Sequence, residues 1–263
     1  LVGKIGRIYQ ARCYNPPADR INGARLSLLK EFLWRQGCEV GEGIIVPDRL
    51  AAARAGVTTY GKNNFAYVDG IGSFVCLSSI IVDRELDYDT STVKINCPEN
   101  CQVCMKACPT GAIYTPLKLN PHRCLAFNNW FTQDGKPAGL SSYIPPEIRE
   151  KMDTKIHGCD ICQEVCPRNK GRLAAAAYKD PYLEKIAEDF DLVKVLNMSD
   201  AYFNRIVRPI MYNYIKEKKY FQRNAAIALG NTKDPVYIGD LKIAMKDQED
   251  LVRSYAAWAL GRI

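Results

Sequence analysis

In the first hundred residues, apolar and polar positions alternate between the spacing of short helices and that of strands. Four apolar residues recur at the spacing of an amphipathic helix, and Gly37 is expected to end that helix. They are Leu26, Leu29, Phe32 and Leu33. A shorter, alanine-rich helix is predicted to start at Pro47-Asp48, with Asp48 as its N-cap, and to end near Gly56.

Two stretches, 65–69 and 73–83, have the β-branched and aromatic content of strands, and the glycines at 70 and 72 are expected to join them. We expect the second to be a buried strand. The loop Gly61-Lys62-Asn63 lies between the short helix and the first strand, where ligands are often held. For Lys62 the alternative is a solvated surface lysine.

The last part of the chain, 171–263, has a helical pattern throughout and repeats itself. AAIALG at 225–230 returns as AAWALG at 256–261, and DLVR at 250–253 precedes the second copy. This pattern resembles HEAT-type helical repeats, in which small alanines let paired helices approach closely.

The composition narrows the class of protein. With 263 residues, 47% hydrophobic and 25% charged, the chain is long enough for one large or two ordinary globular domains. No run of about 18 uncharged apolar residues is present, so we expect no membrane-spanning helix. The net charge of +7 permits an anionic partner.

Cysteine is the unusual component: the chain has eleven, of which eight lie in two blocks and the segment between them. Both blocks end in C-x2-C-x3-C-P, the run of bacterial two-cluster ferredoxins, in which the cysteine before proline binds the other cluster. Cluster A is therefore assigned Cys97, Cys101, Cys104 and Cys166, and cluster B is assigned Cys108, Cys124, Cys159 and Cys162. Cys124 completes cluster B because it is the one cysteine between the blocks. Cys97 precedes Cys101 by one residue more than usual.

Two alternatives to iron–sulfur clusters remain. Disulfide scaffolds are typical of small secreted domains without a sizeable core, which this chain does not resemble. Zinc also binds sets of thiolates, but the interlocked C-P motifs favour clusters. Cys13, Cys38 and Cys76 lie outside the pattern and are interpreted as buried free cysteines.

A basic stretch at 203–223 suits an RNA partner through phosphate pairing and base stacking. Its basic residues are Arg205, Arg208, Lys216, Lys218, Lys219 and Arg223, and its aromatic residues include Tyr212, Tyr214, Tyr220 and Phe221. The alternative is a solvated face on a packed helix.

Most of the chain resembles the epoxyqueuosine reductase family and, more distantly, the cobalamin-dependent reductive dehalogenases. The resemblance rests on RAGVTTYGKN at 54–63, GSF at 72–74, ACPTGAI at 107–113, RC at 123–124 and HGCDICQEVCPRNK at 157–170. It implies an α+β fold in three parts. These are a partial α/β cobalamin-binding-like domain at 1–96, a bacterial ferredoxin-like domain with two 4Fe–4S clusters at 97–170, and all-α HEAT-like repeats at 171–263.

The resemblance also implies a reaction. Electrons would pass through the clusters to a base-off cobalamin held against Gly61, Lys62 and Asn63. The reduced corrinoid would remove the epoxide oxygen of epoxyqueuosine in the anticodon loop of a tRNA, leaving queuosine, while the helical repeats hold the tRNA. We expect an external donor of the flavodoxin or ferredoxin type, a monomer, and the cytoplasm, because exposed clusters are oxidised readily.

The chain departs from the family at two places. Thr58 and Thr59 replace a glycine and a tryptophan before Tyr60. The family's D-[ST]-A-P stretch is absent, and counting back from Arg54 places Glu42 at its aspartate. A buried Glu42 could give the proton to the opening epoxide, with Asp48 as its rival. Two alternatives stay open: a corrinoid reductase for a small molecule, with Tyr60 as proton donor, or an electron-transfer protein without cobalamin.

Overall fold

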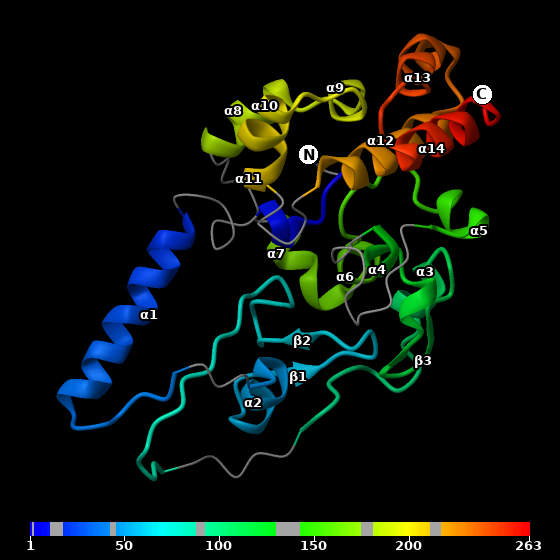
Figure 1. The fold of residues 1–263 in the computed structure, drawn as a ribbon. Helices are drawn as coiled ribbons and strands as arrows, with labels where there is room; N and C mark the ends of the chain where they lie inside the picture. The colour runs from blue at the N-terminus through cyan, green and yellow to red at the C-terminus, as the bar shows by residue number, and fades with distance from the viewer. Residues whose placement is uncertain are drawn as a thin grey trace.

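A computed structural model describes residues 1, 3–10, 18–42, 46–87, 93–129, 143–174, 181–210 and 217–263. Figure 1 shows a helical layer that contains both labelled ends of the chain, with the cysteine-rich segment below it and two short strands further down. Helix α1 stands apart at one side. None of the described helices is long and apolar enough to cross a membrane.

The N-terminal part has little regular structure. Its elements are the 3-10 turn Arg7–Gln10, α1 (Ala18–Arg35), α2 (Asp48–Arg54), β1 (Thr59–Tyr60) and β2 (Ala66–Tyr67). The two strands pair antiparallel with Thr59 opposite Tyr67. The predicted helix over Leu26–Leu33 is confirmed as part of α1, and Gly37 follows it in the left-handed region at φ +79°.

Two predictions for this part are wrong. The N-cap of α2 is Pro47, which has no side-chain cap, and Asp48 is the first helical residue. Residues 73–83 form no strand; only Val82 makes an isolated bridge, to Val40, and most of the segment is half-buried or exposed. β-branched residues favour a strand only where a neighbouring strand completes the ladder, and the described residues offer 73–81 none.

The cysteine-rich segment is built from short helices and one small hairpin. Its elements are α3 (Val103–Ala107), β3 (Ile113–Thr115), β4 (Lys118–Leu119), a 3-10 turn (Pro121–Arg123), α4 (Leu125–Asn129), α5 (Pro146–Arg149), α6 (Ile161–Glu164), a second 3-10 turn (Pro167–Asn169) and α7 (Lys170–Ala174). Helices α3 and α6, which follow the first cysteines of the two blocks, pack on each other.

The C-terminal part is helical wherever the structure describes it, as predicted. It comprises α8 (Pro181–Asp189), α9 (Leu192–Leu196), α10 (Asp200–Tyr202), a π-helical turn (Phe203–Val207), α11 (Arg208–Ile210), α12 (Lys218–Thr232), a 3-10 turn (Pro235–Tyr237), α13 (Ile238–Ala244) and α14 (Asp250–Leu260).

The repeated sequences lie where α12 and α14 pack together. The backbones approach so closely that a Cβ on Gly230 would lie 2.7 Å from Cα of Ala259. Only glycine fits there, because real Cβ atoms do not approach other atoms at that distance. The small residues of AAIALG and AAWALG thus allow this helix contact.

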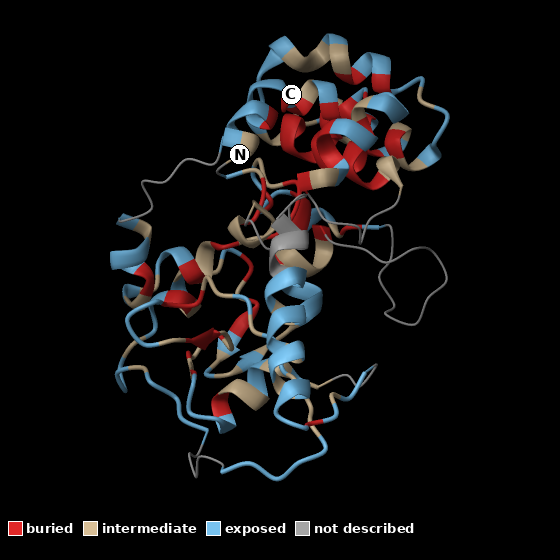
Figure 2. Cartoon of the chain, turned by 90° about the vertical axis from the view of Figure 1, so that its left-hand side faces the viewer, coloured by how far each residue is buried: buried red, intermediate tan, exposed pale blue. Residues whose placement is uncertain are grey.

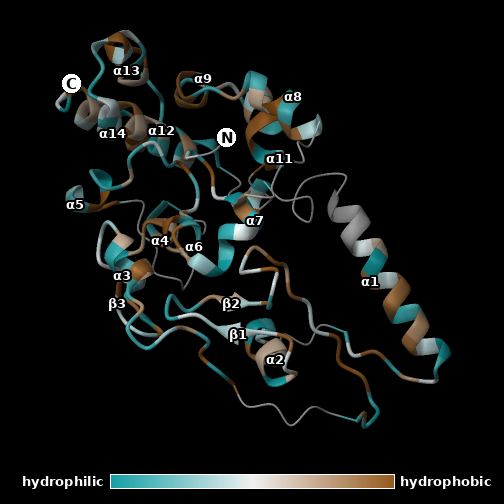
Figure 3. Cartoon of the chain, turned by 180° about the vertical axis from the view of Figure 1, so that it is seen from behind, coloured by the Kyte–Doolittle hydropathy of each residue, from teal (hydrophilic) through white to brown (hydrophobic). Residues whose placement is uncertain are grey.

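The core lies in this helical layer. Figure 2 shows buried residues concentrated there, and Phe221, Leu229 and Leu241 are fully buried. By contrast, α1 carries hydrophobic stretches in Figure 3 although Phe32 and Trp34 are 55% and 70% exposed. The amphipathic pattern of α1 therefore has no matching burial among the described residues.

Buried polar contacts join the helical layer to the cysteine-rich segment. Asn224 of α12 donates to the carbonyl oxygens of Asn129 and Ile156 at 3.0 and 2.7 Å. Asn129 in turn exchanges two hydrogen bonds with the backbone of Gly158, next to Cys159. The side-chain amides of Asn224 and Asn129 are both buried and hydrogen-bonded, so they fix the second cysteine block against the core.

Candidate functional site

The first cysteine set comes from the loop before α3, from α3 itself and from the turn after α6. Cys104 is buried, and burial is the main cause that raises the pKa of its thiol. The negative charges of Cys166, Cys101 and Cys97 raise it further. These four thiols therefore lie within electrostatic reach of one another, although Cys166 is 62 residues from Cys104 (166 − 104).

The second set is gathered in the same way. Burial raises the pKa of Cys159 to about 11 and also raises that of Cys162, on which the charges of Cys159, Cys124 and Cys108 act as well. Burial also raises the pKa of Cys124. At Cys108 burial is outweighed by hydrogen bonds from the Thr110 hydroxyl and three backbone amides, so its pKa is lowered.

These two sets match the donors assigned to clusters A and B. Thiolates are the ligands of iron–sulfur clusters, and burial that opposes a free thiolate is relieved when the sulfur binds a metal. Among the described residues no three cysteine, histidine or acidic side chains converge enough to hold one metal ion. A cubane of several atoms needs its ligands further apart than a single ion, so this spacing is compatible with clusters.

The predicted cofactor loop lies against the first cysteine set. The Lys62 ammonium donates to the carbonyl oxygens of Pro98, Glu99 and Cys101, and its backbone N–H donates to Sγ of Cys97 at 3.4 Å. Asn63 is 2% exposed and donates to the Tyr67 hydroxyl and to the carbonyl oxygen of Cys162. Lys62 is therefore not the free surface lysine of the alternative interpretation.

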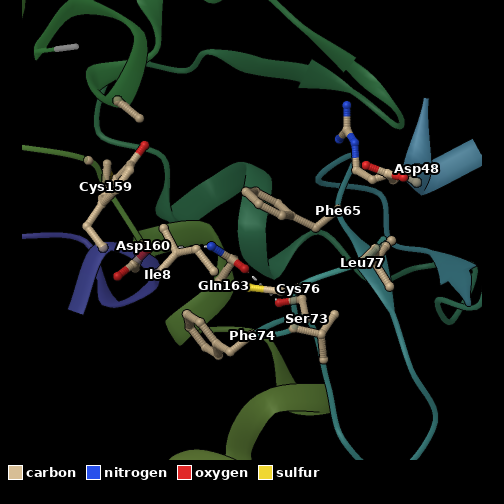
Figure 4. Close-up of a pocket in the computed structure, with 16 residues that line it drawn as sticks. Ile8, Asp48, Phe65, Ser73, Phe74, Cys76, Leu77, Cys159, Asp160 and Gln163 are labelled. Carbon is tan, nitrogen blue, oxygen red and sulfur yellow. Dashed lines mark hydrogen bonds between the residues drawn. The ribbon is translucent and has the colours of Figure 1, made fainter. Parts of the chain in front are cut away.

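A cavity of about 350 Å³ lies between the N-terminal part and the second cysteine block. In Figure 4 Cys159 and Asp160 lie at one end of it and Asp48 at the other. Phe65 and Phe74 contribute flat apolar surface. The volume is in the range of small-molecule pockets, and one wall belongs to a predicted cluster ligand.

The cavity is held in shape by contacts between segments far apart in sequence. The Ser73 hydroxyl donates to Gln163 at 2.8 Å, and the Ser73 amide donates to Oδ1 of Asn169 at 2.8 Å. Gly72 has φ +96°, and a Cβ there would lie 2.2 Å from Asn169 Oδ1. Glycine at 72 is thus required for the GSF segment to reach the second cysteine block.

The predicted catalytic residues do not line this cavity. The Glu42 side chain is 81% exposed and pairs with Lys30 at 3.3 Å, so the burial on which its predicted role depends is absent. The backbone of Tyr60 bonds with residues 94 and 96, and Gly61, Lys62 and Asn63 are likewise outside the cavity lining. Asp48, the rival of Glu42, is one of the lining residues.

The predicted RNA-binding stretch is divided by the structure. Arg205 and Arg208 are exposed, whereas Lys218 and Lys219 pair with acidic residues. Arg223 is completely buried, and burial lowers its pKa to about 9, so its prediction as an RNA contact is wrong. Tyr220 and Phe221 are also buried and cannot stack on bases. Lys216, Tyr212 and Tyr214 lie outside the described residues.

Other predicted or unassigned residues have clear positions. Cys38 is buried, as interpreted, but Cys76 is exposed and lines the cavity, and Cys13 lies outside the described residues. Sequence reasoning missed Asp160, which lines the cavity and accepts a hydrogen bond from the Arg7 amide. Burial raises the pKa of Asp160. Its only signal was its place between two predicted ligands in the second block.

The comparisons with known proteins agree with the cysteine geometry. Residues 96–169 match the family model of the 4Fe–4S double cluster binding domain. The chain is therefore an iron–sulfur protein of the two-cluster class, with cysteine-rich and helical parts that are packed together.

Curated relatives and solved structures are similar to most of the chain. The chain is 33% identical to the epoxyqueuosine reductase of Bacillus subtilis over 248 residues, which is 91% of this chain and 60% of the relative. It matches a crystal structure of an epoxyqueuosine reductase with TM-score 0.77 and 29% identity, covering 96% of this chain and 66% of the other. A second reductase structure, with an epoxyqueuosine-modified tRNA-Tyr stem loop, matches with TM-score 0.75, 28% identity and coverage of 96% and 65%. The chain is thus similar over most of its length to epoxyqueuosine reductases, and it spans about 60% of the length of this curated relative.

Proposed function

We propose that this chain carries the electron-transfer and pocket portion of an epoxyqueuosine reductase, which reduces epoxyqueuosine to queuosine in tRNA. The observation that carries the proposal is the position of Cys159. It belongs to the second cysteine set and also lines the cavity. An electron on cluster B would therefore be next to any molecule bound there, whereas cluster A lies on the side of the Lys62 loop.

The cluster ligands are part of the proposal: Cys97, Cys101, Cys104 and Cys166 for cluster A, and Cys108, Cys124, Cys159 and Cys162 for cluster B. The charge of Cys104 also acts on Cys162, which supports two clusters close enough to exchange an electron. An external donor of the flavodoxin or ferredoxin type would supply the electrons. The family resemblance further favours a cytoplasmic monomer with HEAT-like C-terminal repeats.

The cavity is our proposed position for the reactive face of a cobalamin. Phe65 and Phe74 offer the flat apolar surface that suits a macrocycle, and Cys159 places cluster B behind it. A reduced corrinoid supplies the chemistry of removing the epoxide oxygen. Gly61, Lys62 and Asn63 are not in the cavity lining; Lys62 and Asn63 would act on the cofactor through the cysteine-rich segment, to which both donate hydrogen bonds.

The opening epoxide needs a proton donor. Asp160 lines the cavity but already accepts a hydrogen bond from the Arg7 amide, so the role is proposed for Asp48 or Glu42. Asp48 lines the cavity in this structure, and Glu42 would reach it only if its segment moved. The variants Asp48→Asn and Glu42→Gln remove the acid and keep the size. The donor is the residue whose variant loses queuosine formation while iron and corrinoid content stay at wild-type levels.

The direct test is anaerobic cofactor analysis followed by turnover with epoxyqueuosine-containing tRNA. We expect eight iron atoms and eight acid-labile sulfides per chain, from two clusters of four, together with bound corrinoid. Cys159→Ala should lose cluster B and turnover, while Cys38→Ala, at a buried cysteine outside both sets, should keep them. Zinc in place of iron, or eight irons without any effect of cobalamin, would contradict the proposal.

A second candidate is an electron-transfer protein without cobalamin. The observation that favours it is that the Gly-Lys-Asn loop is used by the cysteine-rich segment rather than by the cavity. It predicts full iron content, no corrinoid, and oxidation of the reduced clusters by a partner protein. Corrinoid bound in proportion to the chain would exclude this candidate.

A further inference from the structure

Lys62 has an unusual use for a lysine near the surface. Its ammonium donates three hydrogen bonds, at 2.9, 2.5 and 3.1 Å, to the carbonyl oxygens of Pro98, Glu99 and Cys101. An ammonium group has three donors, so its hydrogen-bonding capacity is fully taken up by one loop. That loop joins two of the cysteines assigned to cluster A.

The same segment also reaches the sulfur atoms of cluster A. The Lys62 backbone N–H donates to Sγ of Cys97 at 3.4 Å, and the Tyr67 hydroxyl hydrogen-bonds with the Cys166 side chain. Asn63 fixes that hydroxyl by donating to it at 2.9 Å. Both ends of the ligand set, in the first and second cysteine blocks, thus receive contacts from residues 62–67.

Reduction adds negative charge to a cluster, so nearby positive charge and hydrogen bonds to its sulfurs favour the reduced form. Contacts behind the ligands of a metal site also set their orientation. We propose that Lys62 is the positioning residue of cluster A: it holds the loop between Cys97 and Cys101, and its charge raises the reduction potential of that cluster. This inference rests on the ligand sets given under the proposed function.

Cluster B has a separate set of contacts, which allows the two potentials to be told apart. The Ala112 amide donates to Sγ of Cys108 at 3.2 Å, and the Thr110 hydroxyl lies 3.6 Å from the same sulfur. Among the described residues, the sulfur that Lys62 hydrogen-bonds is that of Cys97, whereas the sulfur that Thr110 contacts is that of Cys108. A substitution at Lys62 should therefore change the reduction potential of cluster A, and one at Thr110 that of cluster B.

The experiment is a redox titration followed by electron paramagnetic resonance on the anaerobically purified, reconstituted chain. In Lys62→Met one of the two potentials should fall by at least a tenfold change in the one-electron equilibrium constant, which is about 59 mV. Thr110→Val should move the other potential. The control is Lys94→Met, which removes the same charge from an exposed lysine three residues before Cys97 and should move neither.

Iron content and the potential of a Tyr67→Phe variant provide two further tests. If Lys62→Met retains only four irons where Lys94→Met retains eight, that loss supports the positioning role. In that case Tyr67→Phe, which removes a single hydroxyl, should lower the potential of cluster A by a smaller amount. Eight irons with both potentials unchanged in Lys62→Met would overturn the inference alone. A wild-type chain that binds no clusters would overturn the ligand assignment as well.

Discussion

Helices α1 and α12 have similar lengths but very different surroundings. In α12 every residue from Tyr220 to Gly230 is buried, against α14 and α9 among others. In α1 the apolar residues Leu28, Leu29, Phe32 and Trp34 are exposed by 47% or more. An apolar pattern thus predicts that a helix forms, but burial, and with it most of the stabilisation, depends on a packing partner.

A similar difference in packing distinguishes the two sides of the cavity. The second cysteine block is joined to the helical core by Asn224 and Asn129, whereas the N-terminal wall of the cavity includes the irregular segment after Gly72. The proposed clusters therefore have a rigid support on one side. Four comparisons between variants test whether the helical core is packed more firmly than the N-terminal part.

The largest effect should come from matched phenylalanine truncations. Phe221→Ala removes a fully buried ring, so the free energy of unfolding should fall by about 3–5 kcal/mol. Phe32→Ala, at a ring that is 55% exposed, should change it by less than about 0.5 kcal/mol. Thermal unfolding of the two anaerobically purified variants measures the difference. Equal losses would show that α1 is covered to the same extent as α12.

The second comparison uses two glycines of the helical part. Gly230→Ala forces a Cβ against Ala259, and it should destabilise the chain by about 1–3 kcal/mol through overpacking. Gly239 in α13 has nothing within 4 Å of an added Cβ, so Gly239→Ala should be neutral or stabilising by up to about 1 kcal/mol. The melting temperatures of the two variants measure the difference in stability. If Gly230→Ala were neutral, α12 and α14 could move apart without loss of stability.

The third comparison concerns the arginines of the predicted RNA surface. Under the proposed function, Arg205→Ala and Arg208→Ala should each weaken tRNA binding severalfold and reduce the slope of log affinity against log salt by about one. Arg223→Met should leave affinity unchanged, because Arg223 is buried. Fluorescence anisotropy at several salt concentrations measures both quantities, with Arg35→Ala in α1 as the exposed control. If the Arg223 variant folded normally and lost tRNA affinity while the Arg205 and Arg208 variants kept it, the assignment of exposed and buried arginines would be contradicted.

The smallest effect should come from the exposed ion pair between Lys30 and Glu42. Lys30→Gln breaks a contact of 3.3 Å whose partners are 41% and 81% exposed, so the free energy of unfolding should change by less than about 0.5 kcal/mol. A melting curve beside the wild type suffices. A loss above 1 kcal/mol would mean that this pair holds α1 in place.

Features that depend on local spacing can be predicted from the amino-acid sequence alone. The helix over Leu26–Leu33 and the spacing inside each cysteine block follow from intervals of a few residues, and the structure brings the two blocks together. The small-residue repeat likewise predicted a close helix contact, which is found at Gly230 and Ala259. Such patterns are readable because backbone geometry fixes how neighbouring side chains are disposed.

The contacts of individual polar residues follow from the three-dimensional fold and could not be predicted from the sequence. The sequence predicts Lys62 in a cofactor loop, and the structure adds that its ammonium binds the loop between Cys97 and Cys101. Arg223 was predicted on the surface and is buried, and residues 73–81 lack a strand partner among the described residues. These outcomes depend on contacts between segments that are distant in the sequence, and a local sequence pattern does not indicate which segments come into contact. Burial and hydrogen bonding depend on contacts between distant segments, so they are known only once the fold is known.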